Sequence, residues 1–290
     1  MTNPSQSSGV LSPSKGGTLY IVATPIGNLE DITLRALRVL KEVALIAAED
    51  TRTTRKLLSH YDIHTPLSSC HEYTSPEKEE YLLDLLAGQD IALVTEAGMP
   101  GISDPGVRLI CGAIDRGYRV VPVPGPSAVT TAVAVSGLST DTFLFLGFLP
   151  RDSAERVELL TSVAALPHTL VAFESPHRLR DSLADLVEVL DDRQTVICRE
   201  LTKVHEEVWR GTLRQAVRHF EATEPRGEFT LVIEGAAEKP PAPWTEDQVR
   251  ALLAERKVQG ARARSTVKEV AELAWWPKRD VYQIWIELND

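Results

Sequence analysis

The sequence has few cysteines and no long apolar run. Its 290 residues include only three cysteines, Cys70, Cys111 and Cys198, which lie far apart in the chain. Their odd number and wide spacing argue against a disulfide framework and favour the reducing environment of the cytoplasm. No apolar segment approaches the roughly 18 residues that a membrane helix needs. The sequence therefore predicts a cytoplasmic protein rather than a membrane protein.

Familiar ligand-binding motifs are also missing. The chain has no GxGxxG fingerprint and no P-loop, which disfavours phosphate cradles of those types. The histidines lack the spacing of HExxH and zinc-finger sites, so we predict no metal. The net charge of −10 argues mildly against a protein coated with basic residues for nucleic acid, but it does not exclude a local basic patch.

What is present predicts two α/β domains. The hydrophobic content of 43% is enough for real cores. Residues 18–145 alternate apolar β-type runs with amphipathic helical stretches, which is typical of a buried, mostly parallel sheet with helices on both faces. The same kind of pattern resumes over residues 146–236 and predicts a second α/β domain. The apolar runs are 18–24, 43–48, 91–98 and 119–125 in the first domain, and 169–175, 195–201 and 228–235 in the second.

The ends of the chain differ from these domains in composition. Residues 1–17 are rich in Ser, Gly and Pro and predict a flexible tail, and residues 237–244 predict a semi-rigid, Pro-rich linker. Residues 245–290 predict a small helical, basic unit with two helices, the second with Ser265 as a possible N-cap. The closing apolar segment, 281–288, has no clear type.

Ligands of parallel α/β sheets bind beyond the carboxyl ends of the strands. Four loops rich in Gly, Pro and polar residues follow strands here, and each is either a binding loop or an ordinary turn whose polar residues cap a helix. The third favours the binding interpretation because its three glycines and two prolines would wrap backbone around a small molecule; the alternative is a structural loop in which Asp104 caps the next helix. The loops are 24–31, 47–55, 95–106 and 123–132.

Two charged clusters follow strands of the second domain. They are FESPHR, residues 173–178, and RELTK, residues 199–203. Their side chains either face a shared cleft or form structural salt bridges.

The C-terminal unit carries a concentration of positive charge. Seven basic residues lie between Arg256 and Arg279, against only Glu269 and Glu272. For this basic face we favour an RNA footprint over a solvated helix surface. For Trp275 and Trp276 we favour a small hydrophobic core over base stacking.

Read in order, seven short segments resemble the ribosomal RNA small-subunit methyltransferase I family, a branch of the tetrapyrrole methylase superfamily. The segments are TPIGNLEDITLRAL, IAAEDTR, ALVTEAGMPGISDPG, VPGPSA, GFLP, ESPHR and RELTK-HEE. Each segment alone is weak evidence for the family, whereas the order and spacing of all seven segments are specific to it. ESPHR and RELTK distinguish this branch from the small-molecule enzymes.

The resemblance implies a fold, a cofactor and a reaction. The fold is two α/β domains of the tetrapyrrole methylase type with a cofactor cleft between them, usually in a homodimer, plus a small helical C-terminal unit. The cofactor is S-adenosyl-L-methionine, and the reaction is 2′-O-methylation of a cytidine ribose in 16S ribosomal RNA near the decoding centre. The partner is therefore 16S rRNA or the small ribosomal subunit. The implied cofactor-binding residues are Pro25, Gly98, Met99, Gly101, Ile102, Ser103, Ser127 and Ala128.

The sequence departs from the family pattern in two places. Thr95, Glu96 and Met99 replace residues of the usual SDAGTP segment, and HEYT, with Tyr73 and Thr74, replaces an HxHN-type stretch. These exchanges affect individual side-chain contacts rather than a site made from backbone.

Methyl transfer to a ribose hydroxyl needs alignment and removal of the hydroxyl proton. The candidate catalytic residues, acting as a carboxylate base, a neutral lysine or an orienting group, are Asp50, Glu174, Glu200 and Lys203. The candidates for RNA binding are Arg52, Arg178, Arg199, Arg262, Arg264, Lys268, Lys278 and Arg279. Two alternatives are a methylase of small tetrapyrrole-type molecules and a non-catalytic ribosome-binding protein.

Overall fold

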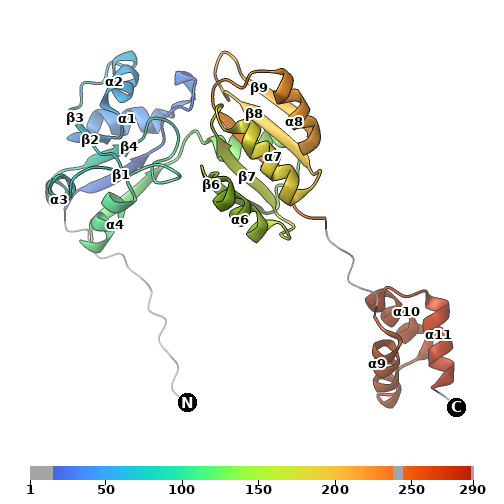
Figure 1. Ribbon diagram of the computed structural model, residues 1–290. Coiled ribbons are helices and arrows are strands. Elements are labelled where there is room, and N and C mark those ends of the chain that lie inside the picture. Colours follow the sequence, from blue (N-terminus) through green and yellow to red (C-terminus); the bar gives the residue numbers. More distant parts are fainter. Residues whose placement is uncertain (1–15, 238–243, 289–290) are drawn as a thin grey trace, which may run out of the picture. The chain divides into compact units, whose positions relative to one another are not determined.

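The computed structural model describes residues 16–237 and 244–288. They belong to two compact units, residues 1–236 and 237–290, which are coloured blue to orange and red in Figure 1. Most of the predicted flexible tail, residues 1–17, and most of the predicted linker, residues 237–244, lie outside the described residues. Within the described part of the chain, no helix is long and apolar enough to cross a membrane.

The first half of the larger unit contains a five-stranded parallel sheet with the strand order β3-β2-β4-β1-β5. The central strand β4 is buried along its whole length, as expected for a strand covered by helices on both faces. The strands are β1 (Thr18–Val22), β2 (Leu45–Ala48), β3 (Leu67–Ser69), β4 (Ile91–Val94) and β5 (Arg119–Val123). The helical segments are η1 (Leu29–Asp31), α1 (Leu34–Glu42), α2 (Thr51–His60), α3 (Pro76–Leu85) and α4 (Val107–Asp115).

The second half contains a mixed sheet with the order β6-β7-β10-β8-β9. Strands β6 and β7 are parallel, whereas β10 is antiparallel to both of its neighbours and β9 is antiparallel to β8. The strands are β6 (Phe143–Phe148), β7 (Thr169–Glu174), β8 (Gln194–Arg199), β9 (Glu207–Thr212) and β10 (Phe229–Ile233). The helices are α6 (Ser153–Val163), α7 (Leu179–Leu190) and α8 (Leu213–Ala222).

Helix α5 (Ala128–Ser136) connects the two halves of this unit. It follows β5 of the first sheet, yet its residues Val129, Ala132 and Val133 pack in one hydrophobic cluster with Val171 and Val232 of the second sheet. The chain therefore places the start of α5 between the carboxyl ends of the first sheet and the second sheet.

The C-terminal unit is a bundle of three helices, α9 (Glu246–Val258), α10 (Ala263–Ala274) and α11 (Lys278–Glu287). The closing apolar segment, whose type the sequence left open, is α11. Ser265 does not cap α10, because this helix begins earlier, after Arg262. The core of the unit includes Trp285, which is 6% exposed.

Candidate functional site

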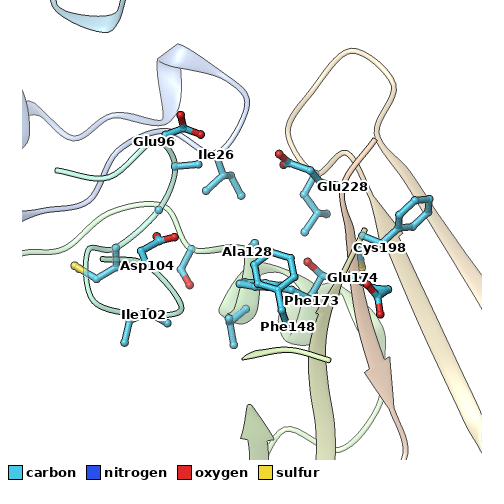
Figure 2. A pocket seen from close by; sticks show the side chains of 18 of the residues that line it. Ile26, Glu96, Ile102, Asp104, Ala128, Phe148, Phe173, Glu174, Cys198 and Glu228 are labelled. Carbon is cyan, nitrogen blue, oxygen red and sulfur yellow. The ribbon is translucent and has the colours of Figure 1, made fainter. Parts of the chain in front are cut away.

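A pocket of about 300 Å³ lies where the loops after the first sheet meet one end of the second sheet (Figure 2). The expected ligand loops and the ESPHR cluster both contribute to its lining. From the first half it is lined by Ile26, Glu49, Glu96, Ala97, Gly98, Met99, Ile102, Asp104, Ser127, Ala128 and Val129. From the second half it is lined by Phe148, Phe173, Glu174, Ser175, Pro176, Cys198, Leu201, Glu228, Phe229 and Thr230.

Two of the four loops are tied together by backbone. The amide of Thr24 donates to the carbonyl of Gly98 over 2.9 Å, and the amide of Gly98 donates back over 3.0 Å. The Thr24 hydroxyl also donates to the carbonyl of Thr95 at 3.1 Å. This pairing fixes the TPIGN loop beside the glycine-rich loop and places Ile26 in the pocket lining.

The glycine-rich loop curls because several of its residues adopt left-handed backbone conformations. Gly98, Gly101 and Ser103 have φ values of 85°, 83° and 60°. The loop ends at Gly106, which is the N-cap of α4, so Asp104 does not cap this helix as the structural alternative required. Asp104 instead lines the pocket.

Carboxylates gather on the first-half side of the pocket. Figure 2 shows Glu96 and Asp104 on that side, and the backbone amide of Glu96 donates to the Glu49 carboxylate at 3.2 Å. Burial and the negative charge of Glu49 raise the pKa of Asp104 to about 6, although the Thr95 hydroxyl offsets part of the rise. Burial, together with the charges of Glu49 and Asp50, also raises the pKa of Glu96. Burial is the larger cause of both shifts, and the neighbouring carboxylates add a negative potential that favours a cationic ligand.

The opposite side of the pocket is largely apolar. The rings of Phe148 and Phe173 meet edge to face with their centroids 5.3 Å apart, and Phe148 is 55% exposed. Between the two sides, α5 begins at Ala128 after Ser127, whose side chain makes no capping hydrogen bond. The first amides of α5 therefore have no side-chain cap, so they are open to a polar ligand group.

Glu174 lies at the end of β7, and its carboxylate is hydrogen-bonded on both oxygens. Oε1 accepts from the Ser175 amide and pairs with Arg178 Nη2, both at 2.7 Å, while Oε2 accepts from the Ser182 hydroxyl. Arg178 also donates to the carbonyl of Leu149 at 2.8 Å. These contacts hold the ESPHR turn in place and use much of the hydrogen-bonding capacity of both side chains.

The RELTK segment forms a charged cluster with Glu228. Lys203 Nζ lies 2.8 Å from Glu200 Oε1 and 2.9 Å from Glu228 Oε2. Burial lowers the pKa of Lys203, but these two carboxylates raise it by more, so Lys203 is a cation rather than the neutral base that the sequence left open. Burial raises the pKa of Glu200, and its bonds to Lys203 and to the Glu228 amide lower it by more.

Asp50 begins α2 as its N-cap, in line with the capping alternative. Its Oδ1 accepts from the Arg52 amide at 2.7 Å, and its Oδ2 pairs with Arg52 Nη2 at 2.8 Å. This hydrogen-bonded pair holds the pKa of Asp50 well below its ordinary value. The Arg52 side chain is 86% exposed.

The pocket lining contains only some of the cofactor-binding and catalytic residues expected from the sequence. Among the expected cofactor-binding residues, Gly98, Met99, Ile102, Ser127 and Ala128 line it, whereas Pro25, Gly101 and Ser103 shape the loops behind it. Among the expected catalytic residues, Glu174 alone lines it, although Lys203 touches the lining residue Glu228. Sequence reasoning missed Glu228, Phe148 and Phe173 as site residues. Of these, Phe148 and Phe173 had a signal, because they lie in the GFLP and FESPHR segments.

The two family departures lie in different settings. Met99 lines the pocket. Tyr73 is 86% exposed, while the buried Thr74 hydroxyl accepts from the His71 amide at 2.7 Å and closes a turn. Among residues 16–237 and 244–288, no three His, Cys, Asp or Glu side chains gather in a metal-binding arrangement.

The pocket suits a ligand that combines positive charge with flat apolar surface. Within the described part of the chain, no lysine or arginine lines it, whereas five carboxylates do: Glu49, Glu96, Asp104, Glu174 and Glu228. S-adenosyl-L-methionine carries a sulfonium and an ammonium group besides its adenine ring, so these residues fit it. Glu49, Glu96 and Asp104 would face the cations, while Phe148 and Phe173 would face the ring.

The basic residues predicted for RNA binding are paired with carboxylates in the larger unit but not, among the described residues, in the C-terminal unit. In the larger unit, Arg178 pairs with Glu174 and Arg199 with Glu207. In the C-terminal unit the five predicted residues are exposed, and none joins an ion pair or side-chain hydrogen bond with any other described residue. They are Arg262, Arg264, Lys268, Lys278 and Arg279.

Comparison with known proteins gives consistent matches. The profile of the tetrapyrrole (corrin/porphyrin) methylases matches residues 18–217. A protein of Halalkalibacterium halodurans named ribosomal RNA small subunit methyltransferase I is 48% identical over 273 residues, covering 93% of this chain and 94% of that protein. The protein of the same name from Thermotoga maritima is 50% identical over 220 residues, covering 76% of this chain but 99% of its own length. Among solved structures, diphthine synthase matches with a TM-score of 0.62 at 13% identity, over 76% of this chain and 90% of that one.

Proposed function

The chain belongs to the tetrapyrrole methylase family, and from this premise we propose that it methylates small-subunit ribosomal RNA with S-adenosyl-L-methionine as methyl donor. The observation that carries the proposal is the acidic and aromatic pocket between the loops after the first sheet and the end of the second. When bound there, S-adenosyl-L-methionine supplies an electrophilic methyl group on a positively charged sulfur. We propose the 2′-hydroxyl of a cytidine in 16S rRNA as the acceptor, a homodimer as the working form and the cytoplasm as the location.

The carboxylates of the first half fit the donor better than the acceptor. RNA is a polyanion, so its phosphates are repelled by the acidic side of the pocket, where Glu96 and Asp104 lie. A cationic donor is attracted by the same charges. We therefore assign this side to the donor and the side of Glu228 and Lys203 to the acceptor ribose.

The acceptor hydroxyl has to be oriented and to lose its proton. Its oxygen lone pair forms the new C–O bond as the C–S bond breaks, the bonding electrons stay on sulfur, and the proton passes to a carboxylate. Glu228 is suited to take it, because it lines the pocket and its side chain is 79% exposed. Lys203, as a cation held by Glu200 and Glu228, orients this carboxylate and the hydroxyl.

The remaining candidates are positioned for other roles. Glu174 and Asp50 are positioning residues in this proposal, because their oxygens are held by Arg178 and Arg52. Arg178 supports the ESPHR turn, while the exposed Arg52 and the partly exposed Arg199 are available to phosphates. Arg262, Arg264, Lys268, Lys278 and Arg279 supply further phosphate contacts from the C-terminal unit.

The decisive experiment supplies radiolabelled S-adenosyl-L-methionine and small ribosomal subunits from a strain that lacks this protein. The RNA is then digested to nucleosides. Label in 2′-O-methylcytidine is the expected result. Transfer to tetrapyrroles but not to RNA would make the chain a small-molecule methylase, and no binding of the donor in calorimetry would refute methyl transfer altogether.

Catalytic variants test the assignment within the pocket. Glu228→Gln and Lys203→Met should reduce kcat by about 10²–10⁴-fold, the usual contribution of general acid–base groups, with little effect on donor affinity. The matched control is Glu221→Gln, which removes an exposed carboxylate outside the pocket lining. Full activity in both catalytic variants would refute the proposed roles.

A further inference from the structure

One aromatic residue of the C-terminal unit is exposed and backbone-strained. Trp275 ends α10 with φ 56° and ψ 37°, a left-handed conformation that glycine and asparagine adopt far more readily than a bulky residue. Its side chain is 60% exposed. The expectation that it belongs to a small hydrophobic core is therefore wrong for Trp275.

The neighbouring tryptophan is built into the fold. The indole N–H of Trp276 donates to the carbonyl of Trp244 at 2.7 Å, and its ring packs against the core of the unit. The expectation of a core role is confirmed for Trp276. Trp276 is therefore a structural residue of this unit, whereas Trp275 is exposed and has a left-handed backbone conformation.

Unpaired positive charge follows Trp275 directly. Lys278 and Arg279 are the first residues of α11, and both are exposed without an ion partner among the described residues. Pro277, the N-cap of α11, makes no side-chain capping bond, so the amides of Lys278 and Arg279 are open to an anion as well, although Asp280 adds one negative charge to the same turn. An exposed aromatic residue three and four positions before two free cations at a helix N-terminus matches the chemistry of one nucleotide, namely a base and its phosphate.

We propose that Trp275 stacks on an unpaired base of ribosomal RNA while Lys278 and Arg279 hold the adjoining phosphate. The proposal rests on the proposed function, because it names how the C-terminal unit engages the RNA substrate. The left-handed conformation of Trp275 ends α10, because the amides of Trp275 and Trp276 both donate to the carbonyl of Ala271. Glycine is the usual residue at such a position, so a bulky and exposed tryptophan there is not favoured by the backbone.

The test measures binding of the full chain to a labelled, unstructured pyrimidine oligoribonucleotide and to an RNA duplex of equal length. Trp275→Ala should weaken binding to the single strand about 5- to 150-fold, as expected for loss of one stacked base. It should leave duplex binding nearly unchanged, because paired bases are not available for stacking. Trp275→Tyr should retain most of the affinity, whereas Trp275→Leu, which keeps apolar bulk without a π face, should not.

Salt dependence separates stacking from charge. Trp275→Ala should leave the slope of log K against log salt concentration unchanged. The double variant Lys278→Ala/Arg279→Ala should reduce the slope by about 0.7 for each single-strand phosphate that the protein no longer neutralises. A changed slope in Trp275→Ala would overturn the assignment of stacking to this residue.

The thermal midpoint of Trp275→Gly distinguishes a stacking role from a packing role, because loss of a packing contact would lower the midpoint. Glycine relieves the left-handed strain, so the thermal midpoint of the C-terminal unit should equal or exceed that of the parent while single-strand affinity falls. A lower midpoint, unchanged affinity, or equal rescue by Leu and Tyr would each overturn the proposal. So would weakened binding to whole subunits with unchanged binding to naked RNA, because Trp275 would then contact protein.

These outcomes are distinguishable from failure of the proposed function. If the parent methylates small subunits but Trp275→Ala binds RNA like the parent, the stacking proposal falls and the function stands. If the parent transfers no methyl group but loses RNA affinity in Trp275→Ala, the stacking site stands and the methylation proposal falls.

Discussion

Gly27 lies against Lys203 so closely that a methyl group on its Cα would stand 2.4 Å from the lysine Cγ. The same methyl group would lie 2.8 Å from Thr202 Oγ1 and 3.0 Å from the carbonyl of Leu201. The TPIGN loop of the first half therefore presses on the RELTK segment of the second. Because Lys203 bonds the pocket residue Glu228, the loop also fixes one side of the pocket.

Gly27→Ala is expected to impair the proposed methyl transfer more than folding. The added methyl group has to displace Lys203 and Thr202, since real Cβ atoms do not approach other atoms to less than 3.0 Å, and it also crowds the carbonyl of Leu201. We expect at least a tenfold loss of kcat, because small misplacements at a reacting centre are costly. Gly88→Ala is the control, as a Cβ there meets nothing within 4 Å. Equal activity of the two variants would contradict this account.

Asp104→Asn is expected to remove a pH dependence of donor binding. The carboxyl has a pKa of about 6, so the parent loses a negative charge as the pH falls through that value, and its affinity for a cation falls with it. Calorimetry between pH 5 and 8 should show affinity for S-adenosyl-L-methionine rising with a midpoint near pH 6 towards a plateau at the upper end of this range in the parent, and a weaker, flatter profile in Asp104→Asn. The affinity for the demethylated product, which lacks the sulfonium charge, should change less with pH. A parent profile that is flat would exclude this role.

The same substitution should stabilise the protein near neutral pH. Folding raises the pKa of Asp104 above its ordinary value of 3.8, so the unfolded chain ionises first and native stability is lost as the pH rises from about 4 to about 6. Asp104→Asn has no carboxyl group to ionise at this position, so its stability does not fall for this reason as the pH rises. We expect a higher thermal midpoint for Asp104→Asn at pH 7 and a smaller difference at pH 4.

Glu174→Leu should destabilise the larger unit. Glu174 is 1% exposed, and its removal leaves Arg178 and the Ser182 hydroxyl without their partner. Breaking a buried pair in this way typically costs about 3–5 kcal/mol. Chemical denaturation should detect the loss, and the double variant Glu174→Leu/Arg178→Met should recover part of it because no unpaired charge remains. A double variant less stable than Glu174→Leu would argue against the ion pair as the cause.

Removal of residues 237–290 should weaken RNA binding without abolishing methyl transfer. The Thermotoga relative matches this chain over 220 residues that make up 99% of its own length, which is close to the length of the larger unit. The pocket also lies wholly in that unit. We expect the truncated chain to show a raised KM for small subunits and a kcat within about tenfold of the parent in the labelling assay. Complete loss of transfer, with the unit still folded by circular dichroism, would place an essential group in the C-terminal unit.

The sequence predicted the strands and loops that have a local or periodic residue pattern. Buried parallel strands are recognised as apolar runs, as β4 is, and the glycine-rich loop at residues 95–106 was found from its Gly and Pro content. Strand β9 was not found, because Glu207 and Arg210 interrupt it and it is only half-buried. Neither the antiparallel pairing of β10 nor the approach of Glu228 to Lys203 has a local signature, since both depend on contacts between distant segments.

Helix α5 also limits how the larger unit can open. Its residues Val129, Ala132 and Val133 are packed on the second sheet, while its first residue, Ala128, lines the pocket and follows directly on the first sheet. Ile26 of the first half belongs to the same hydrophobic cluster, so hinged separation of the two halves would expose this apolar contact to water, at about 25 cal/mol for each Å². We therefore expect donor and product to exchange by displacement of surface loops such as residues 95–106 rather than by hinged opening of the two halves, so that the rate of loop opening would set an upper limit on turnover.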